Sequence, residues 1–198
     1  YSIREDNEYI MFRLYPGSPL ITQMGLRPHD EHVLFELSQS HFQDLKLFLK
    51  DSKAKIYCQN GLSKAPDVIK HDNGKPYLCI IDPPYEAEHE CAEVLEAVQR
   101  ILEVGPLTTI MIWIPIFLEI RREIAELQTN LASVTKSMPV DTVSASIRVT
   151  SKGMIGSCAF IVNPPPKIHA LLESGETLSW LAATLEQEPG CADYELIQ

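Results

Sequence analysis

Four consecutive residues, Asp82, Pro83, Pro84 and Tyr85, form the segment of this sequence that is best suited to chemistry. They directly follow the apolar run 78–81, which is typical of a buried strand, and α/β sheets bind ligands outside the carboxyl ends of their strands. Two prolines fix two φ angles and remove two backbone N–H donors. The turn is therefore expected to present oxygen acceptors in a fixed direction.

An acceptor-only turn suits the recognition of an exocyclic amine, which has two N–H donors. The Asp82 carboxylate can accept one of them and the Pro83 carbonyl the other, while the Tyr85 ring can stack on the attached heterocycle, a contact worth about 1–3 kcal/mol. If the amine attacks a sulfonium methyl group, catalysis requires alignment and stabilisation of the charge that builds on nitrogen. The alternative is that the motif simply ends a strand, because proline and aspartate are common in turns.

The order of apolar and amphipathic segments indicates how this turn is positioned. Short β-branched runs alternate with longer amphipathic stretches, which predicts an α/β fold with a mostly parallel sheet. The expected strands are 32–37, 54–59, 77–82, 108–114, 143–150 and 158–163. The expected helices are 40–49, 88–103, 117–131 and 168–185. The last two strands flank a short turn, so we expect them to pair antiparallel at one edge of the sheet.

Length and charge limit the classes of function. A chain of 198 residues suits a single domain, 1–198. With 17 Lys and Arg against 27 Asp and Glu, the net charge of −10 argues against a large non-specific nucleic-acid surface but not against a local basic path. The candidate phosphate contacts are Arg121, Arg122, Lys152 and Lys167. Exposed charges are usually only solvated, so such a role would require that they share a face with Asp82.

Cysteine usage and hydropathy indicate that disulfides and membrane-spanning segments are not to be expected. The five cysteines are odd in number and scattered, which favours free thiols in a reducing compartment. The longest apolar stretch, 107–118, is too short to span a membrane. The segment His29-Asp30-Glu31-His32, with Glu36 nearby, is interpreted as a solvated turn before a strand rather than as a set of metal ligands. We therefore expect a monomer without disulfide, metal site or membrane segment.

Beyond these residues, the sequence resembles the RlmJ family of adenine-N6 methyltransferases, which act on large-subunit ribosomal RNA with S-adenosylmethionine. The resemblance runs over nearly the whole chain. Its main segments are Tyr-Pro-Gly-Ser-Pro at 15–19, Ile-Asp-Pro-Pro-Tyr-Glu at 81–86, Trp-Ile-Pro at 113–115 and Ile-Val-Asn-Pro-Pro at 161–165. Many amino-methyltransferases share Asp-Pro-Pro-Tyr, whereas the first two segments at this separation are far more selective.

The resemblance implies a Rossmann-like S-adenosylmethionine-dependent methyltransferase fold and methyl transfer to adenine N6 in large-subunit ribosomal RNA. Asp82, Pro83 and Tyr85 would hold the target base, which must be unstacked to enter the site. Two other functions stay open. One is adenine-N6 methylation of DNA, and the other is a non-catalytic, degenerate module that binds RNA or protein. The resemblance also places the protein in the cytoplasm, or in an organelle of a eukaryotic cell.

Four further residues match positions on the cofactor side of the family. Glu36 would accept hydrogen bonds from the ribose hydroxyls of S-adenosylmethionine, and Ser18 lies at a cofactor-side position. Asn60 and Gly61 match an Asp-Gly pair that borders the cofactor adenine. Asparagine keeps an oxygen acceptor there and adds two N–H donors, so binding could continue with altered strength.

The sequence also departs from the family. The glycine-containing loop that wraps the methionine end of the cofactor, the first strand before it and the basic N-terminal segment have no counterpart in this sequence. The missing strand would leave a gap between the strands that end at Glu36 and Asp82, and unpaired strand edges are a folding liability. We therefore expect a fragment of a longer protein that begins near the end of a helical insertion before Pro16. Alone, it is expected to bind S-adenosylmethionine weakly or not at all.

Overall fold

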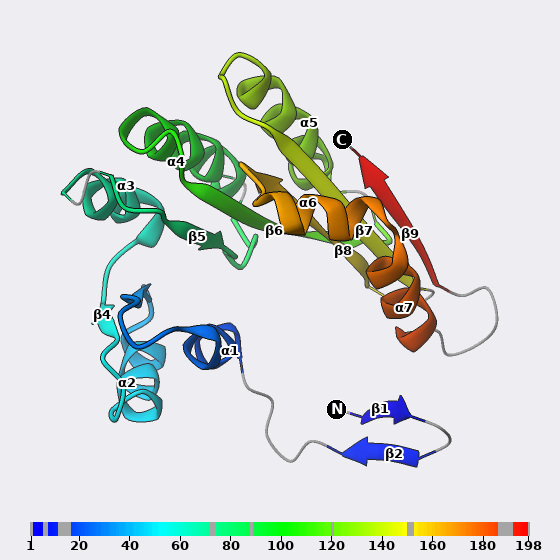
Figure 1. The fold of residues 1–198 in the computed structure, drawn as a ribbon, viewed down its shortest axis with the longest axis horizontal. Helices are drawn as coiled ribbons and strands as arrows, with labels where there is room; N and C mark the ends of the chain where they lie inside the picture. The colour runs from blue at the N-terminus through cyan, green and yellow to red at the C-terminus, as the bar shows by residue number, and fades with distance from the viewer. Residues whose placement is uncertain are drawn as a thin grey trace. The chain divides into compact units, whose positions relative to one another are not determined.

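The computed structural model describes residues 2–5, 8–11, 17–71, 74–87, 89–119, 121–149, 153–185 and 192–197. The chain divides into two compact units, residues 1–64 and 65–198. Figure 1 shows the order of their helices and strands. The units are described in turn.

Among its described residues, the first unit contains two pairs of strands and two complete helices. Its elements are β1 (Ser2–Glu5), β2 (Glu8–Met11), α1 (Ser18–Gly25), β3 (Val33–Phe35), α2 (Gln39–Phe48) and β4 (Lys55–Tyr57). Strands β1 and β2 form an antiparallel hairpin. Strands β3 and β4 pair in parallel, with α2 as their connection, so this part of the unit is a β-α-β motif. Helix α3 (Gly61–His71) crosses the boundary between the units.

The second unit is built on one sheet of five described strands in the order β5-β6-β8-β7-β9. Its strands are β5 (Leu78–Ile81), β6 (Thr109–Phe117), β7 (Thr142–Val149), β8 (Met154–Val162) and β9 (Ala192–Ile197). Its complete helices are α4 (Glu90–Val104), α5 (Arg122–Lys136), α6 (Pro166–Glu173) and α7 (Glu176–Leu185).

The pairings confirm the predicted α/β class and correct the predicted edge of the sheet. Strand β5 pairs in parallel with β6. Strand β8 lies antiparallel between β6 and β7, so β5, β6 and β7 all point in the same direction. The pair predicted at the edge forms as expected, but β9, which the sequence did not predict, lies outside β7 and is the observed edge.

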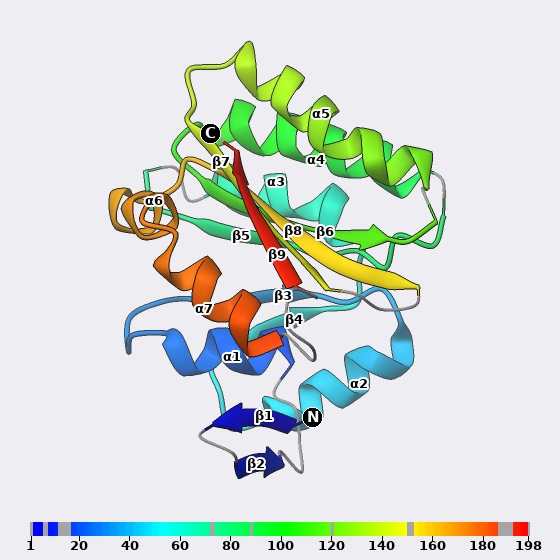
Figure 2. The same cartoon turned by 90° about the vertical axis from the view of Figure 1, so that its right-hand side faces the viewer.

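Strand β6 lies at the centre of the core. Ile110, Ile112 and Ile114 are completely or almost completely buried, and this two-residue period places them on one face of the strand. Helices α4 and α5 cover one face of the sheet, while α6 and α7 lie on the other (Figure 2). Apolar burial on both faces explains why the strand is almost continuously hydrophobic.

Two predicted helices have different bounds in the structure. Strand β6 continues to Phe117, and the helix predicted over 117–131 begins only at Arg122. Pro115 continues the strand opposite Ser157, at a level where β5 has already ended, and proline is tolerated where a strand is paired on only one side. The helix predicted over 168–185 is divided into α6 and α7 at Gly175, whose φ of 69° interrupts a right-handed helix.

None of the helices in the described part of the chain combines the length and the apolar character that crossing a membrane requires.

Gly156 marks a close approach of strands β7 and β8. A Cβ atom at this position would lie 2.1 Å from the carbonyl oxygen of Ile147, which neither rigid backbone can accommodate. We expect Gly156→Ala to lower the free energy of unfolding by about 1–3 kcal/mol, because overpacking forces the backbone to shift. Chemical denaturation measures the loss. Gly25→Ala is the matched control, because a Cβ there meets nothing within 4 Å; equal effects of both substitutions would contradict the close approach.

Candidate functional site

The turn after β5 keeps its acceptor groups at the surface. Asp82 and Pro84 are exposed and Pro83 is half-buried. Ile81 pairs with Ile112 of β6, so the turn begins beside a fully paired strand. Asp82 and Pro83 therefore lie directly after the carboxyl end of a parallel strand.

Tyr85 anchors this turn from the inside. Its φ is 54°, a left-handed conformation that is uncommon outside glycine, and its side chain is only 1% exposed. The phenol Oη donates a hydrogen bond to the backbone carbonyl of Trp113 at 2.7 Å. The ring face that the sequence led us to expect as an open stacking surface is thus covered, because the left-handed backbone turns the side chain into the core.

Burial affects the ionisation of this turn. The surrounding protein raises the pKa of the Asp82 carboxyl above its usual value by desolvation. Burial likewise raises the pKa of the Tyr85 phenol, and nearby Cys91 and Asp82 add to the effect. Tyr85 therefore stays protonated and remains a hydrogen-bond donor to Trp113.

Glu36 lies at the carboxyl end of β3. Its backbone N–H donates to the carbonyl of Tyr57 in β4 at 3.0 Å, which continues the parallel pairing by one residue. Its side-chain Oε1 accepts the N–H of Ser38 at 2.7 Å. The half-exposed carboxylate is thus held in place by one oxygen, and its other oxygen is suited to accept from a sugar hydroxyl.

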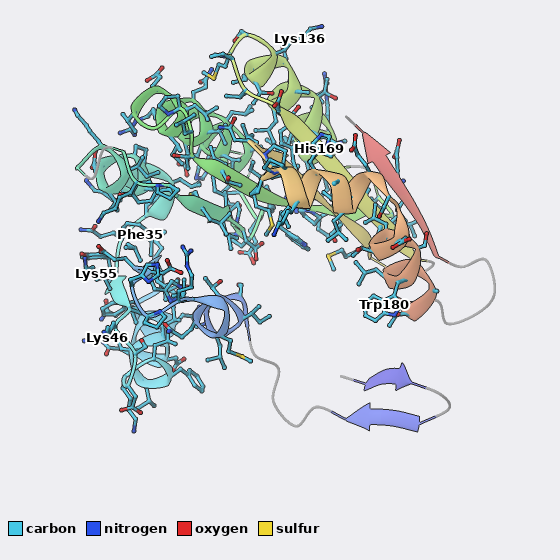
Figure 3. The ribbon with its side chains drawn as sticks, in the orientation of Figure 1. Phe35, Lys46, Lys55, Lys136, His169 and Trp180 are labelled. Carbon is cyan, nitrogen blue, oxygen red and sulfur yellow. The ribbon has the colours of Figure 1, made fainter. Side chains whose placement is uncertain are left out.

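Asn60 and Gly61 lie beside the end of β3. The Asn60 Oδ1 accepts the backbone N–H of Leu62 at 2.9 Å and so caps the first turn of α3. A Cβ on Gly61 would lie 2.9 Å from the Cβ of Phe35, the residue labelled on β3 in Figure 3. The start of α3 therefore packs against β3 next to Glu36. Because the Asn60 oxygen is engaged in the cap, its NH₂ group is the part available to an adenine.

Ser18 is the first residue of α1 and is exposed. Helix α1 is connected to the start of β3 by a 3.1 Å hydrogen bond between Gln23 Oε1 and His32 Nδ1. Burial lowers the pKa of His32, which keeps the imidazole neutral. The four cofactor-side candidates thus belong to the first unit, and the amine-side candidates, Asp82 to Tyr85, belong to the second.

The second proline motif, at Asn163, is a structural turn. Asn163 has a φ of 50°, and its Nδ2 donates to the carbonyls of Pro106 and Thr108 at 2.9 and 3.0 Å. Val162 pairs with Ile110 near the start of β6, so Asn163 lies at the amino end of β6. This is the opposite edge of the sheet from Asp82.

Trp113 contributes to the site in a way that sequence reasoning missed. The structure uses the backbone carbonyl of Trp113 as the anchor for Tyr85. Every residue has a carbonyl, so no signal in the sequence could have identified this one. Only the pairing of β5 with β6 shows it.

The comparison with protein families decides the identity of the chain. The model described as "Ribosomal RNA large subunit methyltransferase D, RlmJ" matches residues 2–197. The chain belongs to this family. RlmJ membership confirms the resemblance that the motifs at 15–19 and 81–86 indicated.

Two curated relatives of the RlmJ family are similar over most of the chain. Both are named "Ribosomal RNA large subunit methyltransferase J". The protein from Escherichia coli K12 is 28% identical over 190 residues, which cover 92% of this chain and 64% of the relative. The protein from Haemophilus influenzae is 28% identical over 179 residues, which cover 89% of this chain and 62% of the relative. The chain thus spans less than two thirds of the length of these relatives.

A solved structure supports the fold. The crystal structure of protein LPL1258 from Legionella pneumophila superposes with a TM-score of 0.75 at 22% sequence identity, over 93% of this chain and 66% of that one. At this identity the likeness concerns the fold alone.

The cap at Asn60 gives a first test of this site. Asn60→Ala should lower the free energy of unfolding by about 1 kcal/mol, because it removes the acceptor for the Leu62 N–H. Asn60→Asp should retain the stability, because a carboxylate accepts the same N–H and is favourable at a helix N-terminus. Thermal unfolding of the two variants beside the wild type measures both effects. An alanine variant as stable as the wild type would contradict the cap.

The Tyr85 anchor gives a second test. Tyr85→Phe keeps the buried ring but removes the hydrogen bond to Trp113, so we expect a loss of about 1 kcal/mol in the free energy of unfolding. Tyr57→Phe is the control, because Tyr57 is 42% exposed and its ring stacks on Phe35 without need of the hydroxyl. Urea denaturation compares the two. A larger loss at Tyr57 than at Tyr85 would be inconsistent with the anchor.

Proposed function

We propose that this chain carries the catalytic part of a methyltransferase that modifies adenine N6 in large-subunit ribosomal RNA, with S-adenosylmethionine as methyl donor. The supporting observation is the exposed Asp82 in a rigid proline turn at the carboxyl end of β5, in a chain of the RlmJ family. The names of the two curated relatives support the same substrate class.

The acceptor turn explains how an adenine amine would be held. The Asp82 carboxylate accepts one amine N–H and the Pro83 carbonyl accepts the other, so the nitrogen is held at two points. As positive charge develops on that nitrogen, the carboxylate stabilises it more strongly than it stabilises the neutral amine, and such differential stabilisation accelerates a reaction. Tyr85 holds the turn to β6 through Trp113, and its ring would stack on the base only after leaving the core.

The first unit supplies groups that fit the adenosine end of the cofactor. Glu36 offers a carboxylate oxygen to the ribose hydroxyls, and the Asn60 NH₂ group can donate to a ring nitrogen of the adenine. Ser18 is a further candidate on the first turn of α1. S-adenosylmethionine, when bound, supplies a methyl group on a sulfonium that an amine can take up. The chain's own contribution is to hold the nucleoside and to orient the accepting amine.

Three related proposals concern the setting of the reaction. The substrate RNA presents an unstacked adenine, because a base inside a helix cannot expose its amine to a turn at a sheet edge. The protein acts as a monomer. It works in the cytoplasm, on RNA that ribosomal proteins do not yet cover.

Substitution of Asp82 tests the proposed role. In a longer version of this protein that binds S-adenosylmethionine, Asp82→Ala should reduce methyl transfer to protein-free large-subunit RNA by a factor of about 10²–10³, the usual effect of removing one preorganised electrostatic group. Retention of radiolabelled S-adenosylmethionine should be nearly unchanged, because the cofactor-side candidates belong to the first unit. Asp67→Ala, an exposed acid on α3, is the control. Full turnover by Asp82→Ala would disprove the role.

The pH dependence follows from the same carboxylate. Desolvation raises the Asp82 pKa, and only the ionised form is free to accept from the amine with both oxygens. The rate of methyl transfer by the longer, cofactor-binding version should therefore increase with pH, through a pKa above the usual carboxyl value. Any residual activity of Asp82→Asn should lack this increase.

Parallel assays on RNA and DNA adenine distinguish the RNA enzyme from a DNA enzyme. If the longer version binds S-adenosylmethionine and RNA but transfers no methyl group, the non-catalytic module is favoured.

A further inference from the structure

Arg121 is a cation that the structure holds in place without an acidic partner among the described residues. Its guanidinium lies 5.4 Å from the centre of the Phe117 ring, a cation–π contact that orients the planar group and leaves its N–H donors available. Both side chains are half-buried. Phe117 ends β6 and Arg121 precedes the first residue of α5, so the pair lies at the junction of a core strand and a helix.

This junction lies on the same edge of the sheet as the acceptor turn. Strand β5 runs parallel to β6, and its last residue, Ile81, pairs with Ile112. Asp82 is therefore at the level of Trp113, and β6 continues for four residues to Phe117, about 13 Å of extended chain. A group at that distance reaches past the nucleotide that carries the amine, toward its neighbours along an RNA strand.

The other candidate cations do not meet this condition. Arg122 is the next residue, but its Nε donates to Glu126 at 2.8 Å, so its charge is already paired. Lys167 lies at the start of α6, which follows Asn163 at the opposite edge of the sheet. Lys152 lies outside the described residues. Arg121 is thus the candidate that shares an edge with Asp82 and has no ion pair with an acid in the part of the chain that the structure describes.

The segments near Arg121 carry exposed apolar side chains and ionisable groups. Leu118 is 61% exposed and Met154, which pairs with Phe117, is 48% exposed, so the chain next to Phe117 carries exposed apolar side chains. Burial raises the pKa of Cys91 on α4, Glu123 adds to the shift and Arg121 opposes it. Arg121 and Glu123 are therefore both close enough to Cys91 on α4, the helix that follows the acceptor turn, to affect its ionisation.

We propose that Arg121, held over the Phe117 ring, binds a phosphate of a nucleotide that flanks the target adenine, with Leu118 and Met154 as the adjoining apolar surface. This inference rests on the proposed function, because it takes the substrate to be RNA. It also accounts for binding by a chain of net charge −10: a few oriented cations at the reaction edge can replace a large basic surface. An acidic protein partner would use the same guanidinium, but the shared edge with Asp82 favours the RNA.

The test is the salt dependence of RNA binding by the whole chain. Binding of protein-free large-subunit ribosomal RNA is measured by filter retention between 50 and 300 mM KCl, for the wild type and for Arg121→Ala, Arg121→Lys, Phe117→Leu and Arg122→Ala. Neutralising one phosphate contributes about 0.7–0.9 to the slope of log K against log salt. For Arg121→Ala we expect the slope to be smaller by about one such increment. Its affinity for the RNA should be about 5- to 10-fold weaker at 100 mM salt.

The other variants separate a contact from a general disturbance. Arg121→Lys should keep the slope and lose part of the affinity, Phe117→Leu should weaken binding less than Arg121→Ala, and Arg122→Ala should match the wild type. Unfolding temperatures of Arg121→Ala and wild type should agree. Where transfer is measured, KM should increase for Arg121→Ala with little change in kcat, as expected for a contact equal in ground and transition states.

The possible failures are distinguishable. If the wild type binds RNA and Arg121→Ala has the same slope and affinity, the inference about Arg121 is wrong and the proposed function is unaffected. If Arg122→Ala loses as much as Arg121→Ala, a general charge effect replaces the specific contact. If the wild type does not bind the RNA at all, the proposed function fails and the inference fails with it.

Discussion

The parallel pairing of β5 with β6 is the constraint on which the rest of the second unit depends. It places the end of β5 beside a strand whose inward isoleucines are inaccessible to solvent, so the turn that follows has a fixed support. The same pairing brings the Trp113 carbonyl within reach of Tyr85. It also fixes how far β6 continues beyond Asp82, and hence where Phe117 and Arg121 lie. Three separate features of the site thus follow from one register.

Much of the fold could be predicted from the pattern of apolar residues. All six predicted strands form, because β-branched runs bounded by polar turns are a strong local signal. The differences between the predicted and the observed elements have physical causes. A strand of alternating polar and apolar residues near the end of the chain, β9, carries a weak signal, and the bounds of β6 depended on whether Pro115 ends a strand, which the neighbouring strands decide. Helix α1 is short and has no buried side chain, and α3 begins at a glycine and contains Pro66, a residue that disfavours a helix interior, so neither segment was expected to be helical.

The candidate site could be predicted as a set of residue types but not as an arrangement. Asp82 and its prolines lie at a strand end, as their order along the chain indicated. The inward orientation of Tyr85 depends on one backbone conformation, which sequence spacing does not encode. Where the family resemblance implies an aspartate, this chain has Asn60, and only the structure reveals the consequence. The side-chain oxygen that a cofactor could have used accepts a hydrogen bond from the backbone of α3.

The left-handed conformation of Tyr85 places two opposing requirements on this position. An L-residue in that region carries roughly 1–2 kcal/mol of backbone strain that glycine would relieve, whereas removal of a buried aromatic side chain from a core costs about 3–5 kcal/mol. Packing therefore outweighs strain, and the buried ring keeps the backbone in this conformation. A glycine variant would also lack the tether to β6, and the carboxylate at 82 would sample many directions instead of one. At this position, loss of activity and loss of thermal stability are expected together.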